Sequence, residues 1–236
     1  LIDALSGKSK PLFTAESLKN VMHISKDHFG TYWICTDEMG LYTATYRSGF
    51  ELSRFTAPKN SDIHQSRIHS VVEDHLQNLF FVARDKGLFY FNRKTNEIDL
   101  YEPDIYYTPS LNSKALITSL YSSSGILWLG TFNRGVNILD SNRKMFHHYK
   151  INYRSDGLFN NNIRSFFQDS EGMIWIGTKE GGGLSRFSPE NVTFENFKYN
   201  PKIKNSFSSD YILTINELNS NELILGTLGD GVDIFN

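Results

Sequence analysis

The stretch GMIWIGTKEGGG, residues 172–183, places a tryptophan inside an apolar run and follows it with Gly-Thr and a cluster of glycines. Such a cluster can form a phosphate-binding loop, or it can form a tight turn that recurs with the architecture. Four other segments share the pattern. The five segments are GTYWICT (30–36), NLFFVAR (78–84), GILWLGT (125–131), GMIWIGT (172–178) and NELILGT (221–227). Their first residues lie 48, 47, 47 and 49 positions apart, so turn geometry is the first explanation of the glycines.

Each repeat is predicted to form four short strands. A first apolar strand such as IRSFFQD (163–169) precedes the tryptophan strand, a third strand follows the next glycine, and a fourth strand alternates aromatic and polar residues. Four strands at a period of 40–50 residues are typical of a β-propeller blade. The second strand is almost wholly apolar because blades stack on both of its faces. The bulky residues expected to pack between neighbouring blades are Trp33, Phe81, Trp128, Trp175 and Ile224.

We therefore predict an all-β fold, with one β-propeller segment over residues 1–236 and five repeats of four-stranded blades. The first residues, LID (1–3), align with ILD (138–140), and the chain stops at the end of another third strand. Two interpretations stay open. Either residues 8–14 supply the fourth strand of the last blade and close a ring, or further blades flank this segment in a larger propeller.

Composition narrows the possible functions. The chain has 24 basic and 26 acidic residues and a net charge of −2, which gives no electrostatic footprint for nucleic acid or for an anionic membrane. No run approaches the roughly 18 apolar residues that span a bilayer. The single cysteine, Cys35, excludes an internal disulfide and a zinc site built on two thiolates. The first residues, LIDALSG, do not resemble a signal peptide, and we expect the segment to be a piece of a longer chain.

The motifs DSEGMIWIGTKEGGGLSRF (169–187) and SSSGILWLGTFNRGVNIL (122–139) strongly resemble the two-component regulator propeller repeat, as does, more loosely, DHFGTYWICTDEMGLYTA (27–44). The segments NNNIRSF (160–166) and NSFSSDYILTI (205–215) are similar to the linkers between blades in that family. The second repeat departs from the pattern, since Arg84 replaces the threonine and Ala83 the glycine, and the fifth lacks the tryptophan.

This resemblance implies the sensor region of a membrane-bound hybrid histidine kinase, located outside the cytoplasmic membrane in the periplasm. Many members of the family respond to oligosaccharides, and their propellers are typically seven-bladed and often in tandem. The implied partners are an oligosaccharide, neighbouring propeller or sensor domains of the same chain, and a second copy of the full-length protein. The resemblance implies no cofactor, and signalling through a kinase rests on the resemblance alone.

In a propeller, the loops between second and third strands share a face with the linkers between blades, and ligands usually meet that face near the axis. The candidate ligand-binding residues in these loops are Asp37, Arg84, Asp85, Asn133, Arg134, Lys179, Glu180 and Asp230, with Glu38 and Lys86 beside them. Carboxylates with nearby amides or guanidiniums suit a sugar, whose hydroxyls both donate and accept hydrogen bonds. Each of them can equally be a solvated turn residue.

Two other functions stay open. A propeller glycoside hydrolase would use carboxylates of the loops or of the innermost strands as acid and nucleophile or base; the innermost candidates are Asp27, Glu73, Asp74, Asp169 and Glu217. A structural propeller would instead dock another protein or propeller. We expect no catalytic residue and no metal site, because His147 and His148 point to opposite faces of a strand and His64 and His69 are only loosely placed.

Three smaller motifs have simple interpretations. Cys35 is expected to fill a small buried slot rather than to act as a nucleophile. GTLGDG (226–231) is followed by a strand and not by the helix that a phosphate loop requires. Tyr106 and Tyr107 can either stack on a sugar ring or seal a blade.

Overall fold

The computed structural model describes residues 18, 20–37, 40–46, 49–58, 61–104, 106, 109–140, 145–151, 157–179, 181–203 and 206–236. Within them, five antiparallel sheets follow one another along the sequence, and the strands of each sheet pair in chain order. The first sheet contains β1 (Val21–Lys26), β2 (Tyr32–Thr36), β3 (Gly40–Tyr46) and β4 (Phe50–Arg54). A short 3-10 helix, η1 (Asp62–Gln65), leads to the second sheet.

The remaining sheets repeat this order. The second contains β5 (Ile68–Glu73), β6 (Leu79–Ala83), β7 (Gly87–Asn92) and β8 (Glu97–Tyr101). The third contains β9 (Leu116–Tyr121), β10 (Ile126–Thr131), β11 (Val136–Asp140) and β12 (Met145–Tyr149). The fourth contains β13 (Ile163–Gln168), β14 (Ile174–Thr178), β15 (Leu184–Ser188) and β16 (Thr193–Phe197). The fifth contains β17 (Ile212–Asn219), β18 (Glu222–Thr227) and β19 (Val232–Phe235).

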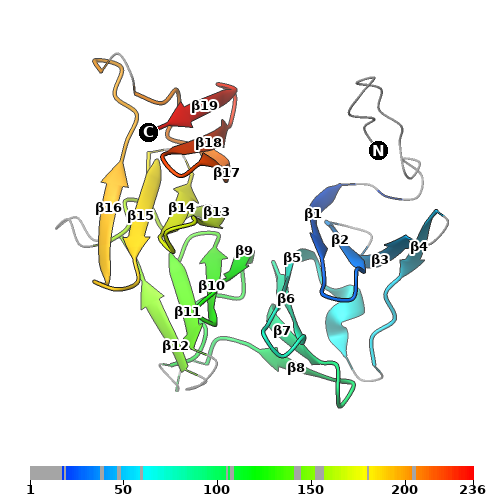
Figure 1. Ribbon diagram of the computed structural model, residues 1–236. Coiled ribbons are helices and arrows are strands. Elements are labelled where there is room, and N and C mark those ends of the chain that lie inside the picture. The colour runs from blue at the N-terminus through cyan, green and yellow to red at the C-terminus, as the bar shows by residue number, and fades with distance from the viewer. Residues whose placement is uncertain are drawn as a thin grey trace.

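The predicted all-β propeller fold is confirmed. The five sheets are blades that follow one another along an arc, with their first strands toward its centre and β4, β8, β12 and β16 on its outside (Figure 1). The first strands β1, β5, β9, β13 and β17 each contact the next one in the series. The proposed ring-closing strand at residues 8–14 lies outside the described residues.

The core consists of apolar clusters between successive blades. Trp33, Trp128 and Trp175 are each at most 6% exposed, and each belongs to a cluster that joins its blade to the next one. Truncating such a residue to alanine costs about 3–5 kcal/mol, because burial is lost and a cavity remains. The prediction that the tryptophans wedge the blades together is therefore correct.

Ile224 is an exception to that prediction. It occupies the same position in the fifth blade but is only half-buried. Its strand partner Ile234 is 59% exposed, and Val232 is 65% exposed, whereas the equivalent Leu184 of the fourth blade is fully buried. The reason is that, within the described residues, the outward face of the fifth blade has no further blade against it.

The second blade corrects the alignment of the repeats by one residue. In every other blade, the residue at the tryptophan position pairs with a fixed residue of the third strand. This partner is the third residue after the glycine at the start of that strand, as Arg186, three residues after Gly183, pairs with Trp175. In the second blade this partner is Tyr90, and it pairs with Phe80. Phe81 is buried between blades as expected, but it faces the first blade, with its ring 5.5 Å from that of Trp33. Phe80 therefore takes the tryptophan position.

A single turn residue explains this shift. The turns before β2, β10 and β14 each place a glycine at positive φ, as Gly172 does at 86°. In the second blade Gln77 adopts that conformation, with φ of 65°, and its N–H donates to the Asp74 carbonyl as the N–H of Gly172 does to that of Asp169. Strand β6 thus begins one residue earlier than the alignment of the repeats predicts. Ala83 then replaces the threonine, and Val82 replaces the glycine.

In the first and fourth blades, an aspartate closes this turn and also binds the tryptophan. Asp169 accepts from the backbone N–H groups of Glu171 and Met173 through Oδ1, and from Trp175 Nε1 at 2.7 Å through Oδ2. Asp27 makes the equivalent bond to Trp33 at 2.8 Å. One carboxylate therefore fixes both the hairpin and the orientation of the indole that packs against the next blade.

The opening glycine cluster forms a turn. Gly181 and Gly183 have backbone φ angles of 83° and 71°, which residues other than glycine rarely adopt. Thr178 Oγ1 donates to the Gly183 carbonyl at 2.9 Å and so closes the loop between β14 and β15. A strand follows the cluster, so the phosphate-loop interpretation is excluded.

Candidate functional site

Each first strand contains a one-residue β-bulge at the end nearest the predicted ligand-binding face. In β13, Ile163 pairs with Thr178 and Ser165 pairs with Gly177, so Arg164 has no partner on β14. The bulged residues, one per blade, are Met22, His69, Ile117, Arg164 and Leu213. A bulge re-aims a side chain out of the ladder. These strands are the innermost edges of the sheets (Figure 1), so we infer that the five bulged residues lie around the axis. We call these five residues the bulge ring.

A second set of five residues lies beside the bulge ring. Each is the residue that directly follows the second strand of its blade. Its backbone N–H donates, at 3.0–3.1 Å, to the carbonyl of the residue that directly precedes the first strand of the same blade. These rim residues are Asp37, Arg84, Phe132, Lys179 and Leu228. Three of them, Asp37, Arg84 and Lys179, are among the residues predicted from the sequence. The identical backbone geometry thus presents a different side chain in every blade.

The bulge ring and the rim contact each other between blades. His69 of the second blade lies with Nε2 3.2 Å from Asp37 Oδ1 of the first. Burial lowers the pKa of His69 although the hydrogen bond to Asp37 raises it, and the nearby charges of Arg84 and Arg67 lower it further. The imidazole is therefore predominantly neutral at pH 7 and donates to the Asp37 carboxylate.

Further along the face, arginines and aromatic rings alternate. The guanidinium carbon of Arg84 lies 5.7 Å from the ring centre of Phe132, and that of Arg164 lies 5.6 Å from the same ring. Arg164 also lies 5.5 Å from the ring centre of Tyr211. These four residues come from the second to the fifth blade, so one cation–π series links four blades on the face predicted to bind a ligand.

A cleft opens beside this series. Its volume is about 540 Å³, and it is lined by Asn133, Ile151, Phe159, Asn160, Asn161, Asn162, Gly181 and Lys198. Asn161 Oδ1 accepts from the Ile151 N–H at 2.7 Å, and Lys198 Nζ lies 4.6 Å from the centre of the Phe159 ring. Asn162 Oδ1 is buried without a hydrogen-bond partner in the part of the chain that the structure describes. We call this site the asparagine cleft.

The other predicted residues are placed as follows. Asp85 accepts from the Arg67 backbone N–H at 3.4 Å and lies 3.7 Å from the Arg67 guanidinium. Lys86 forms an ion pair with Asp62 at 3.1 Å. Three residues are exposed, and the first of them also lines the asparagine cleft: Asn133, Arg134 and Asp230. Glu38, Glu180 and Tyr107 lie outside the described residues, and Tyr106 is 92% exposed. The roles of these residues in binding stay predictions.

Sequence reasoning missed the bulge ring as a set. In the sequence, His69 stands out only as a possible metal ligand and Arg164 does not stand out, because a bulge has no simple residue signature. The one available signal was position: the linker NNNIRSF leads directly into a first strand, and such linkers share the face of the predicted loops. Cys35, by contrast, is fully buried as expected, and burial raises the pKa of its thiol.

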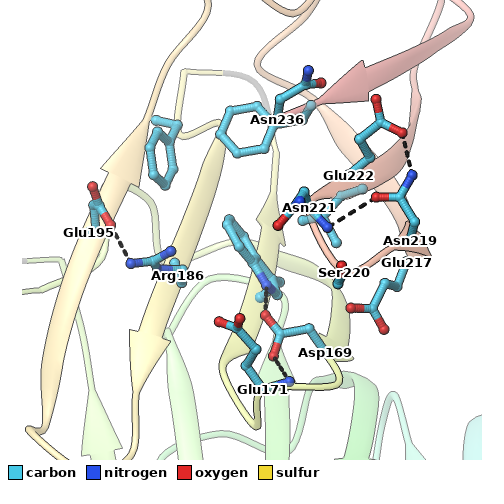
Figure 2. Close-up of a pocket in the computed structure, with 14 residues that line it drawn as sticks. Asp169, Glu171, Arg186, Glu195, Glu217, Asn219, Ser220, Asn221, Glu222 and Asn236 are labelled. Atoms are coloured by element: carbon cyan, nitrogen blue, oxygen red, sulfur yellow. Dashed lines mark hydrogen bonds and ion pairs between the residues drawn. The ribbon is translucent and has the colours of Figure 1, made fainter.

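A groove of about 500 Å³ lies between the fourth and fifth blades. Figure 2 shows Arg186 and Glu195 on one side of it and Asn219 and Glu222 on the other. The groove adjoins β19, whose outer edge is unpaired within the described residues. In the fourth blade the equivalent edge is covered by β16, where Phe194 pairs with Phe187, the counterpart of Phe235. The groove therefore lies where the other blades have their fourth strand.

The carboxylates of this groove have structural partners. Asp169 binds Trp175 and its own turn, Glu217 accepts from the N–H and hydroxyl of Ser170, and Glu195 pairs with Arg186 at 3.1 Å. These contacts give Asp169, Glu217 and Glu195 a role in connecting strands and blades. They lend no support to the glycoside-hydrolase alternative.

Comparison with known proteins identifies the repeat. Residues 157–180, which include the Asn160–Asn162 linker, Arg164 and strand β14, match the two-component regulator propeller family. This segment is thus similar to a two-component regulator propeller repeat. This match confirms the resemblance predicted from the motifs.

One curated protein and several solved structures are similar to this chain. Histidine kinase P4 of Formosa agariphila is 29% identical over 136 residues, which are 55% of this chain and 9% of that protein. The extracellular domain of a putative hybrid two-component system from B. thetaiotaomicron is 22% identical, with a TM-score of 0.57 over 92% of this chain and 33% of that one. Virginiamycin B lyase from Staphylococcus aureus is 13% identical, with a TM-score of 0.61 over 92% of this chain and 69% of that one.

The two structural likenesses, both below 25% identity, show the fold alone. Since an extracellular domain of a putative two-component system and a lyase share it, the fold does not decide whether this protein is an enzyme. The chain spans about a tenth of the kinase and a third of the extracellular domain. In the described ranges, no helix is long and apolar enough to cross a bilayer.

Proposed function

We propose that this segment is a non-enzymatic, extracytoplasmic sensor module of a hybrid two-component signalling protein. In the proposal it stands in the periplasm, binds an oligosaccharide and passes the signal to a histidine kinase of the same chain. The regulator propeller repeat, the kinase relative and the extracellular structural neighbour support this proposal. Neighbouring propeller domains and a second copy of the full-length protein are its proposed partners.

The observation that carries the proposal is the asparagine cleft. Amide side chains both donate and accept hydrogen bonds, as sugar hydroxyls do, and Phe159 provides an aromatic surface. Asn162 Oδ1 is buried without a partner among the described residues. An unsatisfied buried acceptor is unfavourable by about 1–3 kcal/mol, which a bound hydroxyl would offset.

The experiment is a thermal-shift survey with neutral tri- to hexasaccharides, followed by titration calorimetry. A ligand at 100 times its dissociation constant stabilises the protein by about 2.7 kcal/mol, or roughly 5–10 °C in melting temperature for a domain of this size. Asn162→Ala should weaken the binding of any hit about tenfold, since one buried hydrogen bond is lost. Asn191→Ala, at an exposed turn, is the matched control and should leave the affinity unchanged.

The enzyme and scaffold alternatives make different predictions. An enzyme would turn over a chromogenic glycoside, whereas the sensor would bind saccharides without releasing product. A scaffold would form a stable domain or dimer interface and bind no small molecule. A survey with no saccharide binding would contradict the sensor proposal.

A further inference from the structure

Two arginines on the predicted ligand-binding face have no carboxylate partner. Among the described residues, neither Arg84 nor Arg164 lies within 4 Å of an acidic oxygen, unlike Arg67, Arg93 and Arg186. Arg164 Nε is also buried with no hydrogen-bond partner in these ranges. An unpaired guanidinium that is partly removed from water is unfavourable unless an anion is available to it.

Both guanidiniums lie over the same aromatic ring. Each is within 6 Å of the centre of Phe132, so the two are separated by no more than twice that distance. A guanidinium over an aromatic ring keeps its N–H edges available, and those edges form a fork that matches a carboxylate or sulfate. The Phe132 side chain therefore brings two guanidinium groups, each with available N–H donors, to one place on the face.

The neighbouring acids are already engaged. Asp37 accepts from His69, and Asp85 lies against Arg67. The charge of Arg84 adds to the effect of burial in lowering the pKa of His69. Lys179 supplies a further positive charge on the rim. Among the described residues of the rim and the bulge ring, three side chains are therefore positively charged and one, Asp37, is negatively charged, although the chain as a whole has a net charge of −2.

Backbone geometry supports a binding role. Arg164 is the bulged residue of β13, and bulges frequently re-aim a side chain beside a functional site. Its counterparts Met22, Ile117 and Leu213 are apolar, so the fold does not need a cation at this position.

We propose that Arg84 and Arg164 form an oxyanion site at the axial end of the propeller, which binds the carboxylate or sulfate group of an acidic saccharide. This site goes beyond the proposed function, because binding of a neutral oligosaccharide in the asparagine cleft requires neither arginine. The same chemistry would accept a free inorganic oxyanion, and the two sources are separated by experiment.

The test compares digalacturonate, the neutral disaccharide cellobiose and inorganic sulfate by titration calorimetry, at an ionic strength held constant with sodium chloride. We expect digalacturonate to bind more tightly than cellobiose. Arg164→Gln should weaken its binding at least roughly tenfold, and Arg164→Lys should have an intermediate effect because the charge remains but the fork is lost. The control Arg54→Gln removes the same charge from an exposed position on the outermost strand β4 and should leave the affinity unchanged.

Several outcomes decide the matter. Binding of sulfate without digalacturonate, when it is lost in Arg164→Gln, supports the oxyanion site and assigns it to a free anion. Equal weakening by Arg164→Gln and Arg54→Gln would overturn the proposal in favour of unspecific charge attraction, and so would the absence of binding of both anions to the unaltered protein. Circular dichroism and melting temperature of each variant exclude misfolding. Asn162→Ala tests the asparagine cleft separately, since it should change the binding of neutral saccharides only.

Discussion

The bond between Asp169 and Trp175 provides a quantitative test of how the blades are held together. In Asp169→Asn, Oδ1 can still accept from the turn N–H groups, but the amide nitrogen that replaces Oδ2 cannot accept from the indole. The indole N–H, on a side chain only 6% exposed, then loses a partner at 2.7 Å. A buried donor left unsatisfied costs about 1–3 kcal/mol. We expect a loss of about 2 kcal/mol, or roughly 4–8 °C in melting temperature.

The assay is urea unfolding followed by circular dichroism, with the m-value checked for constancy. A double-mutant cycle with Trp175→Phe isolates the bond, because phenylalanine has no N–H to leave unsatisfied. In that background Asp169→Asn should cost less than about 0.5 kcal/mol. An equal cost in both backgrounds would refute the reasoning and would place the whole effect in the turn.

The third blade provides the reverse experiment. Ser122 takes the place of the aspartate, and its hydroxyl accepts from the Ile126 N–H at 3.2 Å. Trp128 Nε1 has no partner in the described part of the chain. Ser122→Asp is therefore expected to stabilise the protein by about 1 kcal/mol, because it restores the missing acceptor. A destabilisation in the same urea assay would mean that burying the carboxylate costs more than the new bond contributes.

Three further predictions concern packing, pH and reactivity. Gly130→Ala should cost about 1–3 kcal/mol in urea unfolding, because its Cβ would lie 2.7 Å from Ile163 Cγ2, whereas Gly49→Ala, with open space around it, should be nearly neutral. Since burial holds the pKa of His69 below its unfolded value of about 6.5, the unfolded state binds the proton first, so stability should fall as pH drops below about 6.5, by at most about 1.4 kcal/mol per pH unit from this group. His69→Gln should flatten that dependence, and an unchanged profile would contradict it. Cys35, fully buried with a raised thiol pKa, should react with a thiol reagent at pH 8 only after urea is added; rapid labelling of the native protein would be contrary to this.

The periodic residues predicted the fold, because each blade repeats the same physical problem. A turn needs a residue that tolerates positive φ, a second strand needs apolar side chains on both faces, and the next blade needs a bulky residue to pack against. The repeat pattern is wrong by one residue in the second blade, where Gln77 adopts the conformation that glycine adopts elsewhere. Asparagine tolerates this conformation better than glutamine. The pattern therefore aligns Asn78 with the turn glycines of the other repeats, one residue after the residue that adopts positive φ.

The candidate site was only half predictable. Asp37 and Lys179 follow the recurring strand directly, so their place on the rim can be counted from the repeat, whereas Arg84 takes the rim position only through the one-residue shift of the second blade. His69 and Arg164 sit at bulges, which depend on pairing between strands and leave no mark in a single sequence. The carboxylates Asp27 and Asp169 were interpreted as possible catalytic groups, although each lies six residues before a tryptophan that it binds. That spacing is visible in the sequence and could have identified their structural role.

The separation of scaffold and site in this propeller has a simple cause. At the bulge, the backbone geometry is the same in all five blades, and the paired residues on either side carry the ladder. The bulged side chain itself makes no ladder contact, so methionine, histidine, isoleucine, arginine and leucine all occur there. A position that the fold leaves unconstrained is one where side chains can differ with the ligand at little cost in stability. For this reason the chemistry of the bulge ring, rather than that of the repeated core, is where the ligand preference of this propeller should be sought.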